Sequence, residues 1–224
     1  MSLEKKIDDL YAWQLLSPLV VGYPYLPFTG AAARPIVLAH VLNEIVVNRR
    51  RSVIEFGSGI STILMARLIQ RNRLDAKVVS IEHDANWVDA MRGLLAAEDI
   101  GDAVEIVHAP LAPCDHALEG NHWYDLSVLA SRIAEKRFDL ALVDGPPAWE
   151  TGKGMTRYPA GPFLEDRMAE RCALFLDDAD RLGERLVMGK WNATGAWKLK
   201  VIHQSFAFAT RGDAFYADPF VYHQ

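Results

Sequence analysis

Five acidic residues stand at or just after the ends of apolar runs, where a carboxylate could do chemistry. Glu55 lies in SVIEF and Glu82 in VVSIE, whereas Asp144 follows LALV and the pair Asp177 and Asp178 follows ALFL. Carboxylates in such places can bind ribose hydroxyls, contact a cationic ligand, take up a proton or coordinate a hard divalent cation. The residues around each carboxylate favour one use over another.

A glycine turn follows Glu55 in the segment EFGSGIST. Gly57 and Gly59 allow close approaches that a Cβ would obstruct, so a ligand can lie against bare backbone there. The third glycine of the dinucleotide fingerprint is replaced by Thr62, and either Ser61 or Thr62 can hydrogen-bond the backbone or the ligand instead. A carboxylate at Glu55 would repel a pyrophosphate and suits a positively charged ligand. A turn that binds nothing is the alternative interpretation.

Glu82 follows Gly57 by 25 residues and ends the next apolar run. A carboxylate at the end of a second strand can accept hydrogen bonds from both hydroxyls of a ribose. The alternative is a solvated strand end. Asp84 is expected to cap the following helix, and His83 is expected to be a lone exposed histidine.

Asp144 begins the segment DGPP, whose two prolines make a stiff turn after the fourth strand. Its carboxylate could contact a cofactor's ammonium, position a substrate or act as a catalytic base, or it could simply close the turn. Asp144, Asp177 and Asp178 could together surround a divalent cation. That metal site is a possibility that the sequence does not favour. The alternatives are a substrate-facing carboxylate at Asp177 or a helix N-cap.

A long segment rich in glycine and proline, residues 148–162, follows Asp144. Loops of this length at the active edge of a sheet are commonly functional. Lys153, Arg157 and Tyr158 could bind an anionic group of a substrate, although Arg157 could equally form a salt bridge at the surface. The N-terminal segment GYPYLPFTG could close over the same cleft from the other side.

Alternating strands and helices must position these residues. Apolar runs predict strands at residues 53–56, 77–82, 104–108, 139–143 and 173–176. Helical periodicity predicts helices at residues 61–71, 86–98, 126–136, 164–171 and 179–188. Such alternation implies parallel strands with right-handed crossovers, hence a doubly wound α/β fold.

The two ends of the chain differ from this alternating middle. Residues 3–17 and 34–48 have helical periodicity, with Pro35 suited to a first turn. Residues 199–210 and 214–222 are separated only by Arg-Gly-Asp, which predicts a hairpin and an antiparallel last strand. We therefore expect an N-terminal helical cap (1–50) and an α/β domain (51–224), together a mostly parallel seven-stranded sheet in one compact unit.

Composition narrows the function classes. The 224 residues carry a net charge of −5, so nothing draws the chain to duplex nucleic acid or anionic lipid. No run of 18 apolar residues exists, so a membrane span is not expected. Cys114 and Cys172 lack the spacing of a zinc site, and few cysteines with no signal peptide suggest the cytoplasm. An apolar N-terminal helix could contribute to a homodimer.

The segments VIEFGSGIST, SIEHD and FDLALVDGPP closely resemble the first, second and fourth motifs of class I S-adenosylmethionine-dependent methyltransferases. The resemblance covers about residues 50–180, and the terminal hairpin is similar to that family's last two strands. It implies S-adenosylmethionine as the cofactor, with Glu55, Gly57 and Gly59 near its methionine part. It also implies that Glu82 binds the ribose and that Pro110 lies near the adenine.

Differences from the motifs of other methyltransferases indicate which kind of atom accepts the methyl group. DGPP lacks the Asn/Asp-Pro-Pro-aromatic motif of amino- and base-methylating enzymes, because Gly145 intervenes and Ala148 follows the prolines. Metal-dependent catechol-type O-methyltransferases have Asp-Asn after the fifth strand, whereas this chain has Asp178 at the second position. We predict methyl transfer to a small molecule, at oxygen in preference to nitrogen.

Two other functions stay open on the sequence alone. An NAD(P)-dependent oxidoreductase is disfavoured by the missing third glycine, by Glu55 and by the absence of a Tyr-x-x-x-Lys pair. A non-catalytic member of the fold that binds a nucleoside or a protein partner is the other alternative.

Overall fold

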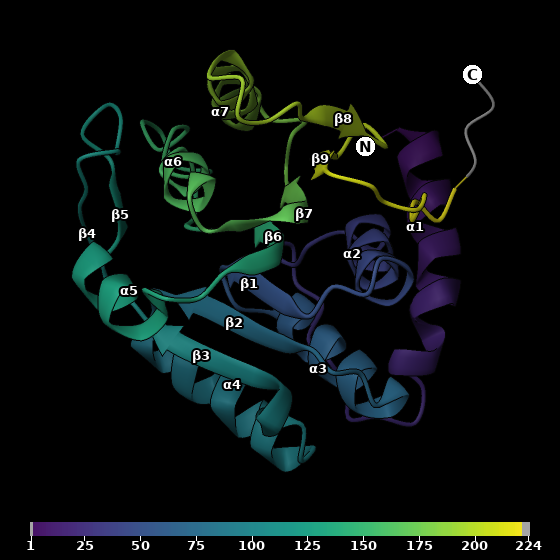
Figure 1. Cartoon of the computed structure of the whole chain (residues 1–224). Coiled ribbons are helices and arrows are strands. Elements are labelled where there is room, and N and C mark those ends of the chain that lie inside the picture. Colours follow the sequence, from purple (N-terminus) through teal and green to yellow (C-terminus); the bar gives the residue numbers. More distant parts are fainter. Residues whose placement is uncertain (1, 221–224) are drawn as a thin grey trace.

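The computed structural model describes residues 2–220 and shows one large sheet with helices on both faces (Figure 1). The sheet has seven strands in the order β3-β2-β1-β6-β7-β9-β8, and a separate two-stranded sheet pairs β4 with β5. The strands are β1 (Ser52–Phe56), β2 (Lys77–Glu82), β3 (Val104–His108), β4 (Leu111–Pro113), β5 (His122–Tyr124), β6 (Phe138–Val143), β7 (Met168–Leu176), β8 (Lys200–Ile202) and β9 (Phe206–Arg211).

The strands β3, β2, β1, β6 and β7 run parallel, and β9 runs antiparallel to both of its neighbours. Strands covered on both faces favour apolar residues on each side, which is why β1 and β6 are mostly apolar, with Glu55 and Asp139 as exceptions. The expected doubly wound, mostly parallel sheet with an antiparallel last strand is confirmed. Because parallel strands end at one edge, β1, β2 and β6 bring their carboxyl ends together there.

Helices cover the two faces of this sheet. The first cluster of buried apolar residues lies under α1 (Leu3–Leu16), α2 (Pro35–Val47), α3 (Ile60–Asn72) and α4 (Ala85–Ala97). The second lies under α5 (Leu126–Ile133), α6 (Ala160–Glu165) and α7 (Leu182–Ala193). Short 3-10 helices occupy Ser17–Leu19 and Gly101–Ala103. Within residues 2–220, no helix is both long and apolar enough to cross a membrane.

The predicted helix at residues 164–171 is wrong. Helix α6 begins earlier, at Ala160, and β7 already begins at Met168. In β7, Met168 is buried and pairs with Phe138, whereas Glu170 and Arg171 are exposed within the register shift between Phe138 and Leu140. In the sequence, the exposed charged residues at the start of β7 resemble the polar face of a helix. Only the pairing with β6 shows that this segment is a strand. Similarly, α7 begins at Leu182 and not at residue 179.

The terminal hairpin exists, but its turn lies elsewhere. Strands β8 and β9 are joined by residues 203–205, and His203 and Gln204 adopt positive φ angles of 51° and 50°. Arg-Gly-Asp instead begins at Arg211, the last residue of β9, and residues 214–220 form no strand. The remaining two residues of the predicted strand, 221 and 222, lie outside the described residues. The prediction followed the glycine of Arg-Gly-Asp, because His203 and Gln204, where the chain actually turns, are not residue types typical of a turn.

His40 of α2 is 2% exposed among aromatic rings of the last strands. Its ring centroid lies 5.1 Å from that of Phe175 and 4.6 Å from that of Phe208. Burial lowers the pKa of His40 from 6.5 to about 4. The charge of Asp218 raises this pKa and that of His203 lowers it, but both effects are smaller than that of burial. The fold therefore holds His40 as the neutral imidazole.

We predict that His40 makes the fold sensitive to acid. Its folded pKa of about 4 lies below the unfolded value of 6.5, so the unfolded chain binds more protons between these values and stability falls as pH drops through them. The loss amounts to about 3 kcal/mol. In urea unfolding across this window, His40→Leu should show a smaller pH dependence than the wild type, although Asp218 still contributes in both. An equal pH dependence in both proteins would contradict the prediction.

Two turns touch at the carboxyl edge of the sheet, one after β1 and one after β6. Gly57 has a φ of 91°, and a Cβ built there would lie 3.0 Å from the carbonyl oxygen of Asp144. A Cβ on Gly145 would lie 2.5 Å from Oη of Tyr124 and 2.9 Å from the Cα of Gly57. Bare backbone at both positions thus permits the contact between the turns.

We expect Gly145→Ala to force these turns apart and to destabilise the protein by about 1–3 kcal/mol, as overpacking does. Gly93→Ala is the matched control, because a Cβ on this glycine of α4 meets nothing within 4 Å. That control should stabilise the helix by up to about 1 kcal/mol. Thermal unfolding of the two variants measures both effects, and equal stability of the two would refute the turn contact.

Candidate functional site

The glycine turn between β1 and α3 is held from below by a buried carboxylate. The Thr62 hydroxyl accepts a hydrogen bond from the Gly59 amide (2.9 Å) and donates one to Oε2 of Glu55 (2.5 Å). Ser80 of β2 donates a second to the same oxygen (2.8 Å). Glu55 is fully buried, and that burial raises its pKa to about 7. Thr62, which replaces the third glycine, therefore ties the start of α3 to β1.

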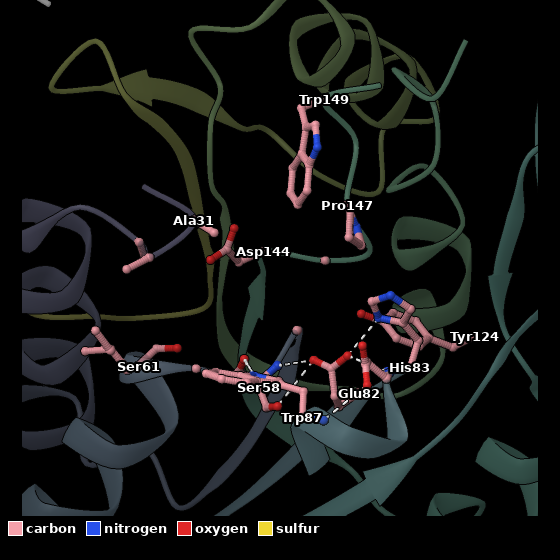
Figure 2. A pocket seen from close by; sticks show the side chains of 17 residues that line it. Ala31, Ser58, Ser61, Glu82, His83, Trp87, Tyr124, Asp144, Pro147 and Trp149 are labelled. Atoms are coloured by element: carbon pink, nitrogen blue, oxygen red, sulfur yellow. Dashed lines mark hydrogen bonds and ion pairs between the residues drawn. The ribbon is translucent and has the colours of Figure 1, made fainter. Parts of the chain in front are cut away.

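Glu82 ends β2 directly beside this turn. Its Oε2 accepts the amide of Ser58 (3.0 Å), and its Oε1 accepts the amides of His83 (2.7 Å) and Asp84 (2.9 Å). Burial alone would raise the pKa of Glu82, but these hydrogen bonds and the His83 ring outweigh it and lower the pKa. Glu82 is therefore ionised, and Figure 2 shows it between Ser58 and His83 on the cavity wall.

His83 and Trp87 belong to the site, although sequence reasoning had not placed either there. The His83 ring lies 2.7 Å from Oε1 of Glu82, and this contact raises the pKa of His83. It is therefore an ion-pair partner of Glu82, which corrects the expectation of a lone exposed histidine. Asp84 caps α4 as predicted, accepting the amides of Asn86 and Trp87. The Trp87 indole then donates to the carbonyl of Ser58 (2.8 Å).

A cavity of about 290 Å³ opens at this edge of the sheet (Figure 2). It brings together residues that the sequence predicted for the site, namely Gly57, Gly59, Ser61, Glu82 and Asp144. In Figure 2, Pro147 and Trp149 lie opposite Trp87, with Asp144 between the two sides. Residues 31–33, directly after GYPYLPFTG, add a third wall, whereas no residue of GYPYLPFTG itself lines this cavity.

Five other predicted site residues do not line this cavity: Glu55, Pro110, Arg157, Tyr158 and Asp177. Glu55 lies beneath the glycine turn, and Pro110 is exposed, with its carbonyl accepting the amide of Asp125 (2.9 Å). The carbonyl of Tyr158 accepts the Trp191 indole (2.9 Å). Arg157 and Asp177 are buried next to Asp144.

Tyr124 reaches the cavity from a strand. The segment His122–Tyr124 forms β5, antiparallel to β4, and α5 begins only at Leu126 behind the Asp125 cap. The Tyr124 hydroxyl is buried, lines the cavity and has no hydrogen-bond partner among residues 2–220. Burial raises the pKa of Tyr124 well above 10, so it keeps its proton and can donate to a ligand. Trp123 packs inward against Phe56 instead.

The three carboxylates at the ends of β6 and β7 do converge. One ligand atom each of Asp144, Asp177 and Asp178 lies within 4.8 Å of the others. Burial and the adjacent Asp177 raise the pKa of Asp144 well above its ordinary value. Asp178 does not cap a helix, because α7 begins at Leu182 after Arg181, and this corrects one alternative for that residue.

The Arg157 guanidinium lies inside this cluster. Its terminal nitrogens are 3.2 Å from Oδ1 of Asp144 and 3.2 Å from Oδ2 of Asp178. It also donates to the carbonyls of Asp144, Pro146 and Asp177. With a side chain only 2% exposed, Arg157 forms no surface salt bridge, contrary to one of the expectations. No sequence signal distinguishes an exposed loop arginine from one whose loop folds inward.

The sequence matches a protein family described as methyltransferase domain over residues 54–179, which is more than half of the chain. No curated protein matches it. The fold is similar to that of the O-methyltransferase TomG from Streptomyces achromogenes, solved in complex with S-adenosylmethionine. That similarity has a TM-score of 0.58 at 16% identity and covers 95% of this chain and 100% of that chain.

Two further solved structures share the fold. An O-methyltransferase from Bacillus cereus in complex with S-adenosylhomocysteine has a TM-score of 0.54 at 16% identity, covering 92% of this chain and 90% of that chain. A methyltransferase from Pyrococcus furiosus has a TM-score of 0.57 at 14% identity, covering 93% and 98%. The family match and the strand arrangement agree, and the chain therefore belongs to the methyltransferase domain family as a class I S-adenosylmethionine-dependent methyltransferase.

Proposed function

We propose that this chain transfers the methyl group of S-adenosylmethionine to an oxygen atom of a small-molecule acceptor. The observation that carries the proposal is the convergence of the glycine turn, Glu82 and Asp144 on one cavity. These groups come from the ends of β1, β2 and β6, which lie side by side in the sheet. Ligands of open α/β sheets bind at this edge.

The cavity offers what a sulfonium nucleoside needs. Gly57 and Gly59 present bare backbone, and ionised Glu82 is an acceptor for the ribose hydroxyls. The unpartnered Tyr124 hydroxyl is a donor inside the same cavity. The hydroxyl of Ser61 also lies at the wall. Thr62 and buried Glu55 occupy the place where a dinucleotide fingerprint needs a third glycine, which argues against a pyrophosphate.

Asp144 is the residue we assign to the acceptor. Bound in the cavity, S-adenosylmethionine would supply a methyl group already activated by a sulfonium, so the chain chiefly has to align a nucleophile and remove its proton. The Asp144 carboxylate lies at the wall, and its raised pKa makes its ionised form a stronger base towards a hydroxyl. Pro147, Trp149 and the alanines at 31–33 provide an apolar wall that can exclude water.

Oxygen is favoured over nitrogen on two grounds. The similar structures from Streptomyces achromogenes and Bacillus cereus are named O-methyltransferases. In addition, the DGPP turn lacks the aromatic residue of the Asn/Asp-Pro-Pro-aromatic motif. A second hollow of about 610 Å³ lies beside the cavity and offers room for a small acceptor. The two hollows share His83, Pro147 and Trp149.

Glu82→Ala is expected to weaken S-adenosylhomocysteine binding by about 10²-fold, because two hydrogen bonds to a charged group are lost. Isothermal titration calorimetry measures this, with NAD as the competing ligand. Glu105→Ala is the matched control, since that glutamate of β3 pairs with Lys136 and Arg132 away from the cavity. Unchanged affinity in Glu82→Ala would show that the cofactor binds elsewhere. Tight NAD binding without S-adenosylhomocysteine binding would overturn the proposed function.

Asp144→Asn is expected to lower kcat by roughly 10²–10⁴-fold, the usual contribution of a general base, while S-adenosylhomocysteine affinity stays within a few-fold of wild type. The measurement is the release of S-adenosylhomocysteine with an acceptor found by testing phenols, catechols and other hydroxylated compounds. A kcat equal to wild type would remove Asp144 from the chemistry. Cofactor binding without turnover across all acceptors would instead favour a non-catalytic nucleoside-binding protein.

A further inference from the structure

The carboxylate cluster beside the cavity has the composition of a divalent-cation site but already contains a cation. Asp144, Asp177 and Asp178 each offer an oxygen atom within 4.8 Å of the others, a spacing that Mg²⁺ or Ca²⁺ could bridge. Two of these three carboxylates are ion-paired with Arg157 at 3.2 Å. The guanidinium nitrogen that pairs with Asp178 also lies 3.7 Å from Oε1 of Glu184.

The guanidinium is fixed in this position. Its three nitrogen atoms donate to the carbonyls of Asp144, Pro146 and Asp177, which belong to the segments that follow β6 and β7. The Arg157 side chain is 2% exposed, and an arginine cannot escape its charge by deprotonation. Withdrawing it would leave three carbonyls and several carboxylates without their donor in a buried place, which is strongly unfavourable.

A divalent cation and this guanidinium cannot share the cluster. A cation bound to Asp144 and Asp178 would lie about 2.0–2.6 Å from oxygens that they present, next to the nitrogens already bonded there. Two positive charges at that separation repel strongly in a poorly hydrated site. The residues present therefore do not fit a resident metal, although the three carboxylates alone would.

We propose that the Arg157 guanidinium takes the place of a divalent cation between Asp144 and Asp178, so that this chain works without a metal. In this arrangement Arg157 is a positioning residue. It holds Oδ1 of Asp144, and thereby the carboxylate at the cavity wall, and it joins the ends of β6 and β7. The part concerning methyl transfer rests on the proposed function, whereas the exclusion of metal does not.

Removal of the guanidinium charge should turn the cluster into a metal site. We expect Arg157→Gln to bind Mn²⁺ roughly a hundredfold more tightly than the wild type, because the repelling charge is gone. Arg157→Lys should bind no more Mn²⁺ than the wild type, since it keeps a cation there. The protein is first treated with EDTA, and the EDTA is then removed. Mn²⁺ is added next, and its binding is followed by the electron paramagnetic resonance signal of free Mn²⁺.

Two controls accompany this titration. Arg167→Gln makes the same substitution in an arginine that lies over Phe163 and donates to its carbonyl, so it should leave Mn²⁺ binding unchanged. Arg157→Gln combined with Asp178→Asn should lose the gained affinity. A merely structural role of Arg157 would create no new Mn²⁺ affinity, so a folded Arg157→Gln variant without a gain overturns the proposal.

If the circular dichroism spectrum shows that Arg157→Gln does not fold, Mn²⁺ binding by the wild-type protein tests the proposal instead. Mn²⁺ binding by the wild type that Asp178→Asn abolishes would overturn the proposal, whereas no Mn²⁺ binding supports it. S-adenosylhomocysteine titration of the same samples keeps the two proposals separate. Failure of that titration would refute the proposed function and leave the metal result standing. Where an acceptor is known, EDTA should not change the wild-type rate.

Discussion

The contact between the turns after β1 and β6 is the constraint on which the site depends. Gly57 and Gly145 approach so closely that a Cβ on either would meet backbone atoms of the opposite turn. This contact places the Asp144 carboxylate beside the glycine turn, and the neighbouring end of β2 adds Glu82. Three carboxyl ends of adjacent parallel strands thus form one cavity, because parallel strands all end at the same edge of a sheet.

Buried charge around this contact is compensated locally, and each compensation shapes the site. Glu55 is buried and accepts hydrogen bonds from the hydroxyls of Thr62 and Ser80, so it fixes the glycine turn from below. Glu82 is kept ionised by backbone amides and His83, which leaves a charged acceptor at the cavity wall. Arg157 compensates the cluster on the other side of Asp144. Removing one partner of such a buried set leaves an uncompensated charge, so breaking any of these networks would destabilise the fold.

Much of the framework was predictable because local sequence determines it. The strands and the caps depend on apolar runs and on residues such as Asp84, whose side chain satisfies amides two and three residues away. Errors arose where two local signals compete. The charged residues Glu170 and Arg171 imitate a helical face, and Arg-Gly-Asp imitates a hairpin turn, although the chain turns at His203 and Gln204. Pairing with strands far away in the sequence decides such cases.

The sequence by itself determined the α/β framework, the glycine turn and the carboxyl edge at which Glu82 and Asp144 meet, because period, turn residues and strand ends are local properties. Only the tertiary structure decided the surroundings of those groups. It buried Arg157 among carboxylates, placed Glu55 beneath the turn instead of at the cavity wall, and brought His83 and Trp87 to the ligand side. These positions depend on how a loop folds back and on which face of a strand is covered, and contacts between distant segments fix both.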